Sequence, residues 1–334
     1  MNNADNRQIW IFAQTDSTGI KASFYQLLSK TRQLVASMAT PAKTAAVFLG
    51  EPDEAALKAA KSSGVDFIYI AEHPKLDVYN PDYYISALYA LTSKYRPDAF
   101  WIPASSIGSE IAPAVACRLK TGLVAHGVDM YMHDGSEYVI PVPAFGGKYL
   151  SEELCPEKRP VMATFKEGLF EAEPPAAFGK AEIIVEHIND LDGLESRIEY
   201  RGSVSNPVDT LPIDKADFVI CGGLGASDEA TYKKLGLLAE RCNAVLGHTR
   251  PIIDIGLEDT EDRLIGTSGK SIHPKVYLSF GVSGASHHMF GVKGSNVIIA
   301  VNNDPRAEIF GACDIKAVAD ADAVVSACLK ELTS

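Results

Sequence analysis

The stretch that decides the fold is Gly281 to Asp304, GVSGASHHMFGVKGSNVIIAVNND. An apolar strand pattern, Val276 to Leu278, leads into a Gly/Ser turn and a short helix with two histidines, and a second apolar run, Val297 to Val301, follows. A strand that enters such a turn and then a helix start directs backbone N–H groups at one spot, which is the geometry that cradles phosphates. A turn without a ligand also uses Gly and Ser, so these residues alone leave nucleotide binding and a plain turn equally open.

The same order of strand, turn and helix comes earlier in the second half of the chain. Asp217 to Ile220 is predicted as a strand and Gly222 to Gly225, GGLG, as a tight turn. A helix is predicted over Glu229 to Arg241, with Ser227 and Asp228 available to cap its start. A lone GGLG after a strand is weak evidence for a nucleotide, because the same glycines can serve only to pack the helix on the strand.

The first half of the chain alternates apolar strands with amphipathic helices. Continuous apolar strands between such helices indicate a parallel sheet that is covered on both faces. Between Tyr138 and Glu186 short strands with many Gly and Pro replace this pattern, and Val142 to Leu150, VPAFGGKYL, is its most distinctive part. The predicted elements are strand Gln8–Ala13, helix Phe24–Met38, strand Ala45–Leu49, helix Glu54–Ser62, strand Phe67–Ala71, helix Tyr83–Tyr95, strand Ala99–Pro103 and helix Glu110–Leu119.

A linker is predicted between these two halves. Arg201 to Pro212, RGSVSNPVDTLP, has two prolines and small polar residues, as a domain boundary should. A chain of 334 residues is also longer than most single cores, which stop growing near ~250–300 residues. We therefore predict an α/β protein of two domains, 1–205 and 206–334, each with a parallel sheet, and we expect the linker to let the second domain swing.

Charge and hydropathy exclude several functional classes. The net charge of −12 argues against a sequence-independent nucleic-acid binder, which needs clustered Lys and Arg. No run approaches the ~18 apolar residues of a membrane helix, and no basic run favours an anionic membrane surface. The start of the chain, MNNADNRQIWIF, lacks the charged start and apolar core of a signal peptide.

The cysteines indicate a reducing compartment. None of the six lies in a CxxC pair or at metal-ligand spacing to a histidine, so we predict no metal site. Scattered cysteines in apolar surroundings are usually small buried residues, and we expect the protein to be cytoplasmic. No nucleophile–base pair emerges either, so we do not expect bond-making chemistry by this chain.

Motifs along the second half come in one order and spacing that points to a known family. They are VLGHTR at Val245–Arg250, then Asp254 and Gly256, GTSGK at Gly266–Lys270, GVSGASHH at Gly281–His288, AVNNDP at Ala300–Pro305 and AVAD at Ala317–Asp320. Together they resemble the FAD-binding, Rossmann-like C-terminal domain of the electron-transfer flavoprotein alpha subunit. The first half is similar to that family's first domain at IWIFAQ (Ile9–Gln14), IAPAVACRLKTGL (Ile111–Leu123), PAFGGK (Pro143–Lys148) and RPVMAT (Arg159–Thr164).

The resemblance implies an electron carrier rather than an enzyme. It implies a heterodimer with a beta subunit, in which one FAD is held mainly by the second alpha domain in a cleft that faces the partner. Such carriers take electrons from flavin dehydrogenases, an acyl-CoA dehydrogenase for example, and pass them to a downstream acceptor. Some members instead pair with a beta subunit that holds a second FAD, and these members split electron pairs from NADH.

The resemblance also implies the residues of the FAD site. Arg250 matches the arginine against the flavin ring, where a permanently charged guanidinium favours the negative charge of reduced flavin. His288 matches the histidine at the flavin C2 carbonyl. Asn302 and Asp320 match further cofactor positions, although each could equally cap a following helix. The full implied set is Thr249, Arg250, Ile265, Gly266, Thr267, Ser268, Ser283, Gly284, Ala285, Ser286, His287, His288, Asn302 and Asp320.

The chain departs from the family pattern at several of these turns. Leu224 stands where the family's first turn usually has an arginine that reaches the cofactor. Thr267 and His287 each replace a glutamine, and Ser268 replaces a threonine but keeps the hydroxyl. A histidine can ionise near neutral pH, so His287 can add a pH-dependent charge to the site.

Two other functions remain as alternatives from the sequence. A stand-alone nicotinamide-dependent oxidoreductase would use the parallel α/β domains and GGLG, but no acidic residue ends a second strand about 20 positions beyond GGLG, where it would bind ribose. A flavin-free scaffold subunit would explain Leu224. Flavin absorbance of the purified protein separates the electron-carrying flavoprotein subunit from the flavin-free scaffold subunit.

Overall fold

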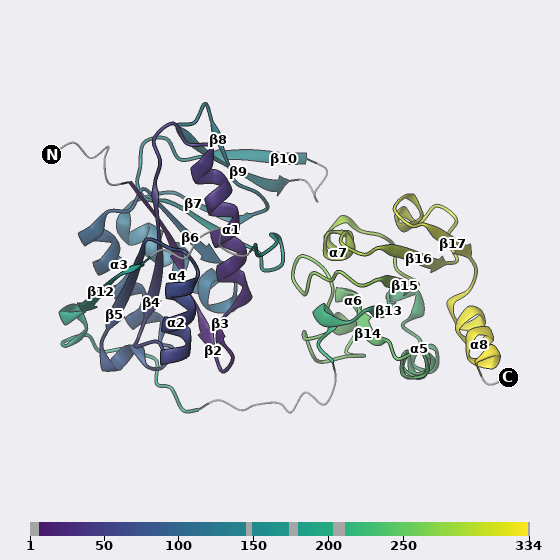
Figure 1. Ribbon diagram of the computed structural model, residues 1–334. Helices are drawn as coiled ribbons and strands as arrows, with labels where there is room; N and C mark the ends of the chain where they lie inside the picture. Colours follow the sequence, from purple (N-terminus) through teal and green to yellow (C-terminus); the bar gives the residue numbers. More distant parts are fainter. Residues whose placement is uncertain (1–6, 145–148, 174–179, 203–210, 333–334) are drawn as a thin grey trace. The chain divides into compact units, whose positions relative to one another are not determined.

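The computed structural model describes residues 7–144, 149–173, 180–202 and 211–332, and these residues form two compact units. The first unit comprises the described residues up to 202, and the second comprises 211–332 (Figure 1). The predicted boundary at 205/206 lies outside the described residues, as do 203–210 of the predicted linker and 145–148 of VPAFGGKYL.

A parallel sheet forms the centre of the first unit. Its described strands are seven, in the order β12-β5-β4-β1-β6-β11-β7, and all neighbours pair in parallel. The strands are β1 (Gln8–Phe12), β4 (Lys43–Leu49), β5 (Phe67–Glu72), β6 (Ala99–Pro103), β7 (Leu123–Gly127), β11 (Val161–Phe165) and β12 (Glu182–His187). The predicted parallel sheet is confirmed, and the Gly/Pro-rich segment, which was expected only to break the pattern, adds the completely buried strand β11 to its interior.

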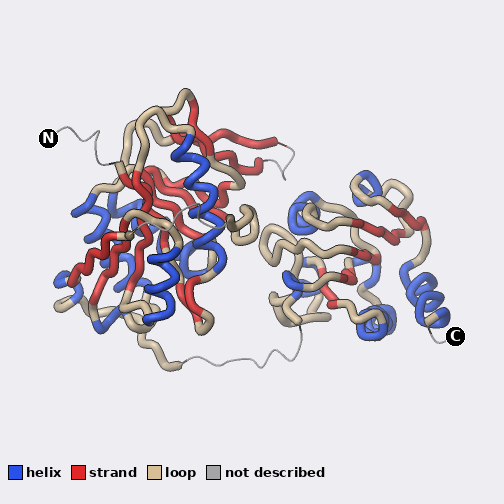
Figure 2. The backbone as a smooth tube through the Cα atoms, in the orientation of Figure 1, coloured by secondary structure: helices blue, strands red, loops and turns tan. Residues whose placement is uncertain are grey.

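Helices cover both faces of this sheet (Figure 2). Helices α1 (Ala22–Ala36) and α2 (Glu54–Ser62) pack on the face that carries Ile9 and Ile11. Helices α3 (Pro81–Tyr95) and α4 (Ser106–Leu119) pack on the opposite face, which carries Trp10 and Phe12. Because successive strand residues point to opposite faces, the unbroken apolar run of β1 is buried on both sides.

Three of these helices begin earlier than the apolar periodicity indicated. The side chain of Asn80 caps α3 and Pro81 occupies its first turn, while the hydroxyl of Ser105 caps α4 by accepting from the amide of Gly108. Polar capping residues start a helix before its apolar stripe begins, so hydrophobic spacing alone places the start too late. Helix α1 likewise starts at Ala22, whereas α2 has the predicted bounds.

Smaller antiparallel sheets complete the first unit. Strands β8 (Tyr131–His133), β9 (Glu137–Ala144) and β10 (Tyr149–Leu154) form one sheet, and β2 (Thr15–Asp16) pairs with β3 (Gly19–Ile20) in another.

The six cysteines are all free, but the expected burial holds only for Cys221. Cys117 is exposed because it lies on the face of α4 that points away from the sheet core formed by Val115 and Ala116.

The second unit is built on a parallel sheet whose described strands are five, in the order β14-β13-β15-β16-β17. The strands are β13 (Phe218–Gly222), β14 (Val245–His248), β15 (Val276–Phe280), β16 (Val297–Asn302) and β17 (Ile315–Val318). The first strand in sequence therefore lies between the second and the third, so the winding direction reverses between β13 and β15. Such a reversal creates a crevice at the carboxyl ends of the two strands, where α/β proteins bind ligands.

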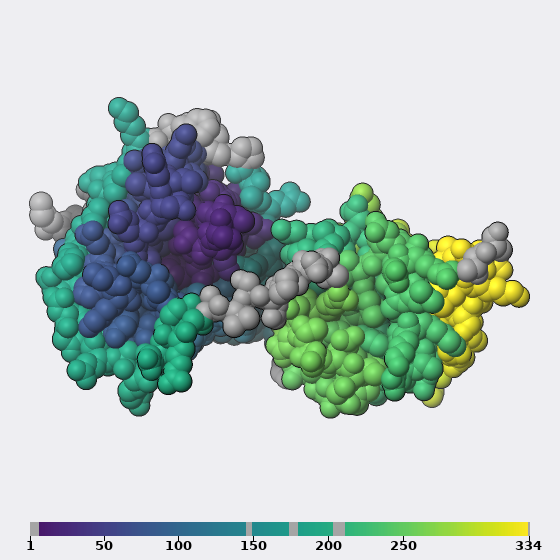
Figure 3. All heavy atoms as spheres, turned by 90° about the horizontal axis from the view of Figure 1, so that it is seen from below, coloured from purple at the N-terminus to yellow at the C-terminus, as the bar shows by residue number. Residues whose placement is uncertain are grey.

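Helices also cover this second sheet on both faces. Helices α5 (Glu229–Arg241) and α8 (Ala321–Glu331) share a core with β13, and the C-terminal residues of α8 form part of the surface drawn in yellow in Figure 3. The short helices α6 (Arg250–Asp254) and α7 (Ser286–Val292) follow β14 and β15. Ile252 of α6 joins the core of α5 and α8, and Val292 of α7 packs in the core on the opposite face of the sheet. Both units are thus parallel α/β structures, as predicted. Among the described residues, no helix has the length and apolar character needed to cross a bilayer.

Candidate functional site

The residues expected from the sequence gather at one edge of the second unit's sheet. Because its strands are parallel, their carboxyl ends share an edge. Thr249 and Arg250 follow β14, and GGLG begins at Gly222, the last residue of β13. The segment Ser283 to His288 follows β15, Asn302 ends β16 and Asp320 follows β17. The edge that collects them contains the reversal between β13 and β15.

Two glycine turns meet at this reversal. The amide of Gly223 donates to Phe280 O and the amide of Gly225 donates to Gly281 O, both at 2.9 Å. Gly281 has φ +64°, and a Cβ there would lie 2.4 Å from the carbonyl carbon of Gly225. These glycines are therefore required for turn-to-turn packing. The amide of Gly281 is used as well, because it donates to Val301 O. The sequence left open whether these glycines bind a nucleotide or only form the turns. For Gly281 and Gly225, close packing of the two turns explains why glycine is required.

The loop between β14 and β15 forms backbone hydrogen bonds both to β14 and to α7. The amide of Ile265 donates to His248 O at 3.0 Å, and the amide of Thr267 donates to His287 O at 2.9 Å. Gly266 between them has φ +138°, and a Cβ there would lie 2.9 Å from His287 O. The structure thus brings Ile265 to Ser268 against the start of α7, 20 residues away in sequence, and leaves Thr267 and Ser268 exposed.

His288 lies behind this loop. His288 is 7% exposed, and both of its ring nitrogens have hydrogen-bond partners within the chain. Nδ1 lies 3.1 Å from Ile265 O, and Nε2 lies 2.6 Å from the hydroxyl of Tyr277. Burial lowers the pKa of His288 to about 4, so the ring is neutral at physiological pH. A carbonyl only accepts, so Nδ1 donates to Ile265 and the Tyr277 hydroxyl donates to Nε2.

His287 has the opposite surroundings. Its residue is exposed, and its Nδ1 lies 3.1 Å from Oγ1 of Thr267. The family resemblance places His288 at the flavin carbonyl, and His287 is expected to add a pH-dependent charge to the same site. In the structure the accessible imidazole at this edge is that of His287, while the nitrogens of His288 hold Ile265 and Tyr277.

Arg250 is the first residue of α6. Its side chain is 51% exposed, and it pairs with Asp254 at 3.0 Å and with Glu261 at 3.2 Å. The hydrogen bond to Asp254 is the largest cause that raises the pKa of Arg250, so its charge is fixed. The hydroxyl of Thr249, at the N-cap position, makes no hydrogen bond to the helix and is not committed to capping.

Asn302 and Asp320 have structural roles at the edge. The side-chain amide nitrogen Nδ2 of Asn302 donates to Val282 O at 2.8 Å, and its side-chain oxygen Oδ1 accepts from the backbone amide of Asp304. The expectation that Asn302 could cap a helix entered at Pro305 is wrong, because a short 3-10 turn begins only at Glu308. Asp320 does cap α8 by accepting from the amide of Ala323 at 3.0 Å.

Sequence reasoning missed the residues that contact the expected site residues His288 and Arg250. Tyr277 is a completely buried residue in the middle of β15, where the sequence shows only one more apolar strand position. Its hydroxyl finds a partner in His288, as buried tyrosines generally require. In the sequence, Asp254 stands out only as part of a family motif and Glu261 lies in no motif, because a single charged residue in a loop carries no pattern.

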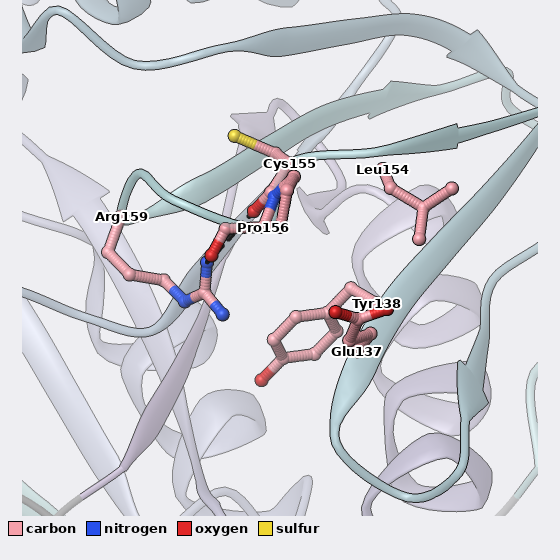
Figure 4. A pocket seen from close by; sticks show the side chains of 6 residues that line it. All are labelled: Glu137, Tyr138, Leu154, Cys155, Pro156 and Arg159. Atoms are coloured by element: carbon pink, nitrogen blue, oxygen red, sulfur yellow. Dashed lines mark hydrogen bonds between the residues drawn. The ribbon is translucent and has the colours of Figure 1, made fainter.

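A separate pocket lies in the first unit (Figure 4). Its lining includes Tyr138 and Arg159, and both contact Asp98, which also pairs with Arg7. Its volume of about 10 Å³ has room for one water-sized molecule, so we assign it no ligand. The part of the chain that the structure describes contains no cluster of His, Cys, Asp and Glu able to hold a metal ion.

Comparison with known proteins identifies the family. Residues 9–191 match the model of the electron transfer flavoprotein domain, and residues 212–293 match the model of the electron transfer flavoprotein FAD-binding domain. The chain belongs to the electron transfer flavoprotein alpha-subunit family. The second match covers the loops at the edge from GGLG to His288 and ends before Asn302.

Similar proteins extend over nearly the whole chain. Electron transfer flavoprotein subunit alpha of Thermoanaerobacterium thermosaccharolyticum is 28% identical, covering 98% of this chain and 98% of the relative. Protein FixB of Rhizobium meliloti is 31% identical over 95% of this chain and 90% of its own length. Acryloyl-CoA reductase electron transfer subunit beta of Anaerotignum propionicum is 30% identical, over 92% and 90%. As a member of this family, the chain is an FAD-binding electron carrier rather than an enzyme.

The residues at the edge fit this cofactor chemically. Exposed or partly exposed hydroxyls of Ser268, Ser283 and Ser286 can serve the polar atoms and phosphates of FAD. The imidazole of His287 and the guanidinium of Arg250 supply donors for carbonyl or phosphate oxygens. When bound, FAD supplies the redox chemistry, and the residues of this chain supply binding and electrostatics.

Proposed function

We propose that the second unit holds FAD at the carboxyl edge of its sheet, across the reversal between β13 and β15. The observation that carries this proposal is the convergence there of loops that are far apart in sequence. The expected residues come from the loops after β14, β15, β16 and β17, and the family match covers the first two of these loops. Ligand binding at such a reversal is the general behaviour of open parallel sheets.

Within this proposal the side chains have distinct tasks. Arg250 presents a fixed positive charge, which favours the reduced, negatively charged flavin. The exposed pair of Thr267 and His287 faces the cofactor, and His288 supports the same loop from the buried side through Ile265. The remaining expected contacts are backbone and hydroxyl groups of Thr249, Ile265, Gly266, Ser268, Ser283, Gly284, Ala285 and Ser286, with Asn302 and Asp320 shaping the far side of the edge.

The proposal includes a partner subunit. The relatives are named as subunits, which supports a heterodimer of this chain with a beta subunit. We assign beta-subunit contacts to residues 1–205 and FAD binding to residues 206–334. Electrons would arrive from a flavin dehydrogenase, for example an acyl-CoA dehydrogenase, and leave to a downstream acceptor. The six free cysteines support a cytoplasmic location.

Coexpression with the beta subunit tests this function. An open edge provides only one wall of a ligand site, so the isolated chain should hold FAD weakly and the heterodimer should hold it stoichiometrically. A heterodimer that purifies without FAD would contradict the proposed function. Tight stoichiometric FAD on the isolated chain would contradict the need for the partner. Two FAD molecules per heterodimer would favour the bifurcating variant, which uses NADH.

A further inference from the structure

The pair of carboxylates around Arg250 has no counterpart in the expected site. Arg250 begins α6, and Asp254 ends the same short helix four residues later. Their side chains meet at 3.0 Å between Nε and Oδ1. Glu261 comes from the loop that follows and meets Nη1 at 3.2 Å through Oε1. Two separate segments therefore hold one guanidinium by two of its nitrogens.

This arrangement fixes the direction of the guanidinium. The contacts occupy the Nε and Nη1 positions, so the planar fork can turn about neither carboxylate without breaking the other contact. The Nη2 side lies outside both pairs. The two contacts thereby favour one orientation of this long side chain at the start of a five-residue helix, directly after Thr249, the residue that follows β14.

The same contacts change the charge that the arginine presents. The guanidinium carries one positive charge and the two carboxylates carry two negative charges, so the cluster as a whole is negative. All three side chains are more than half exposed, at 51%, 57% and 66%, so solvent screens the pairs and they add little to folding stability. Such a contact contributes little to folding stability, but it sets the position of a charge beside the proposed flavin site. It can therefore change how strongly the reduced flavin is favoured.

We propose that Asp254 and Glu261 are positioning residues for Arg250, which orient its guanidinium at the FAD site and limit how strongly its positive charge favours reduced flavin. This inference rests on the proposed placement of FAD at this edge. Substitution by the isosteric amide keeps an acceptor oxygen for Arg250 but removes the negative charge. Asp254→Asn and Glu261→Gln should therefore let more of the positive charge act on the cofactor.

The test is a spectroelectrochemical titration of the FAD-loaded heterodimer. At a fixed potential near the midpoint, each amide variant should raise the ratio of reduced to oxidised flavin about two- to fivefold, the range that a half-exposed ion pair supports. Asp259→Asn is the matched control. Asp259 is an exposed neighbour that forms neither of the two ion pairs with Arg250, so its substitution removes the same charge without removing either contact. The dissociation constant of FAD, measured on the same variants, is a second readout and should stay within about twofold for all three.

The background variant Arg250→Ala separates the possible causes. If the carboxylates act through Arg250, the amide substitutions made in this background should have no more effect than Asp259→Asn. Equal effects with and without Arg250 would overturn the inference, and so would amide variants that match the control. If Arg250→Ala itself changes neither the redox ratio nor FAD affinity, the proposed placement of Arg250 at the flavin fails as well. These outcomes distinguish a wrong role for the carboxylates from a wrong location for FAD.

Discussion

The imidazole Nδ1 of His287 lies 3.1 Å from the hydroxyl oxygen of Thr267, and the amide of Thr267 donates to the carbonyl oxygen of the same histidine. These are the two positions at which the chain departs from the glutamines of the family pattern. The structure shows that the departures touch each other, so they form a pair rather than two independent changes. The pair joins the loop after β14 to the start of α7 on the exposed side of the proposed site.

The first prediction concerns which histidine affects the flavin. His287→Gln should shift the flavin potential, because it removes the exposed imidazole that contacts Thr267. His288→Gln should leave the pH dependence of the potential above about pH 5 unchanged, because burial lowers the pKa of His288 to about 4 and its ring stays neutral over this range. Spectroelectrochemical titration of both heterodimer variants at several pH values measures this. The reverse result would return the flavin contact to His288, as the family resemblance alone implies.

The second prediction concerns acid stability. The pKa of His288 is about 4 in the folded chain, below the 6.5 of an imidazole in an unfolded chain. The unfolded chain therefore binds the proton first, and stability falls as the pH falls from about 6.5 to about 4, by up to about 3 kcal/mol. Urea unfolding followed at pH 7.5 and pH 4.5 should show a smaller pH effect in His288→Gln than in the wild type. A pH effect of the same size in His288→Gln and in the wild type would contradict this role of the buried imidazole.

A third prediction concerns the missing arginine of the first glycine turn. Leu224 is 57% exposed at the start of the 3-10 turn Leu224–Ala226, so its replacement by a longer side chain meets no core. Leu224→Arg should tighten FAD binding about three- to tenfold by adding a charge-assisted contact to the cofactor. Leu237→Arg adds the same charge to an exposed position of α5, where the leucine is 40% exposed, and should not improve affinity. Equal gains from both would point to net charge alone.

The fourth prediction separates backbone conformation from close packing. Gly284 has φ +89°, and a Cβ there would lie 2.1 Å from the amide nitrogen of Ile309. Gly256 has a similar φ of +75°, but a Cβ there would have no neighbour within 4 Å. Gly256→Ala should cost about 1 kcal/mol of unfolding free energy, from the left-handed backbone alone. Gly284→Ala should cost about 3 kcal/mol or more, because it adds a clash with backbone.

Denaturant unfolding of the two glycine variants checks this difference, and FAD affinity of the heterodimer provides a second measurement. The Gly284 variant should also lose FAD, since the turn that follows β15 must shift to admit the new methyl group. Similar costs for the two variants would show that φ, and not the contact with Ile309, determines the requirement for glycine.

Much of the fold follows from local sequence. Unbroken apolar runs such as that of β1 are buried on both sides, and this property by itself indicates a parallel sheet between helices. Helix ends were predicted less well, because Asn80 and Ser105 start α3 and α4 outside the apolar stripe. Strand β11 was not foreseen inside the sheet, since strand order depends on crossovers that join distant segments and leave no periodic signal.

The sequence by itself determined the two parallel α/β units, the family and the loops that carry the candidate site, because these depend on residue type, periodicity and spacing. Only the tertiary structure decided how those residues are used. It buried His288 against Tyr277 and Ile265, left His287 open beside Thr267, and placed Asp254 and Glu261 on Arg250. Burial and pairing set the charge and direction of a side chain, and both arise from contacts between segments that the linear order keeps apart.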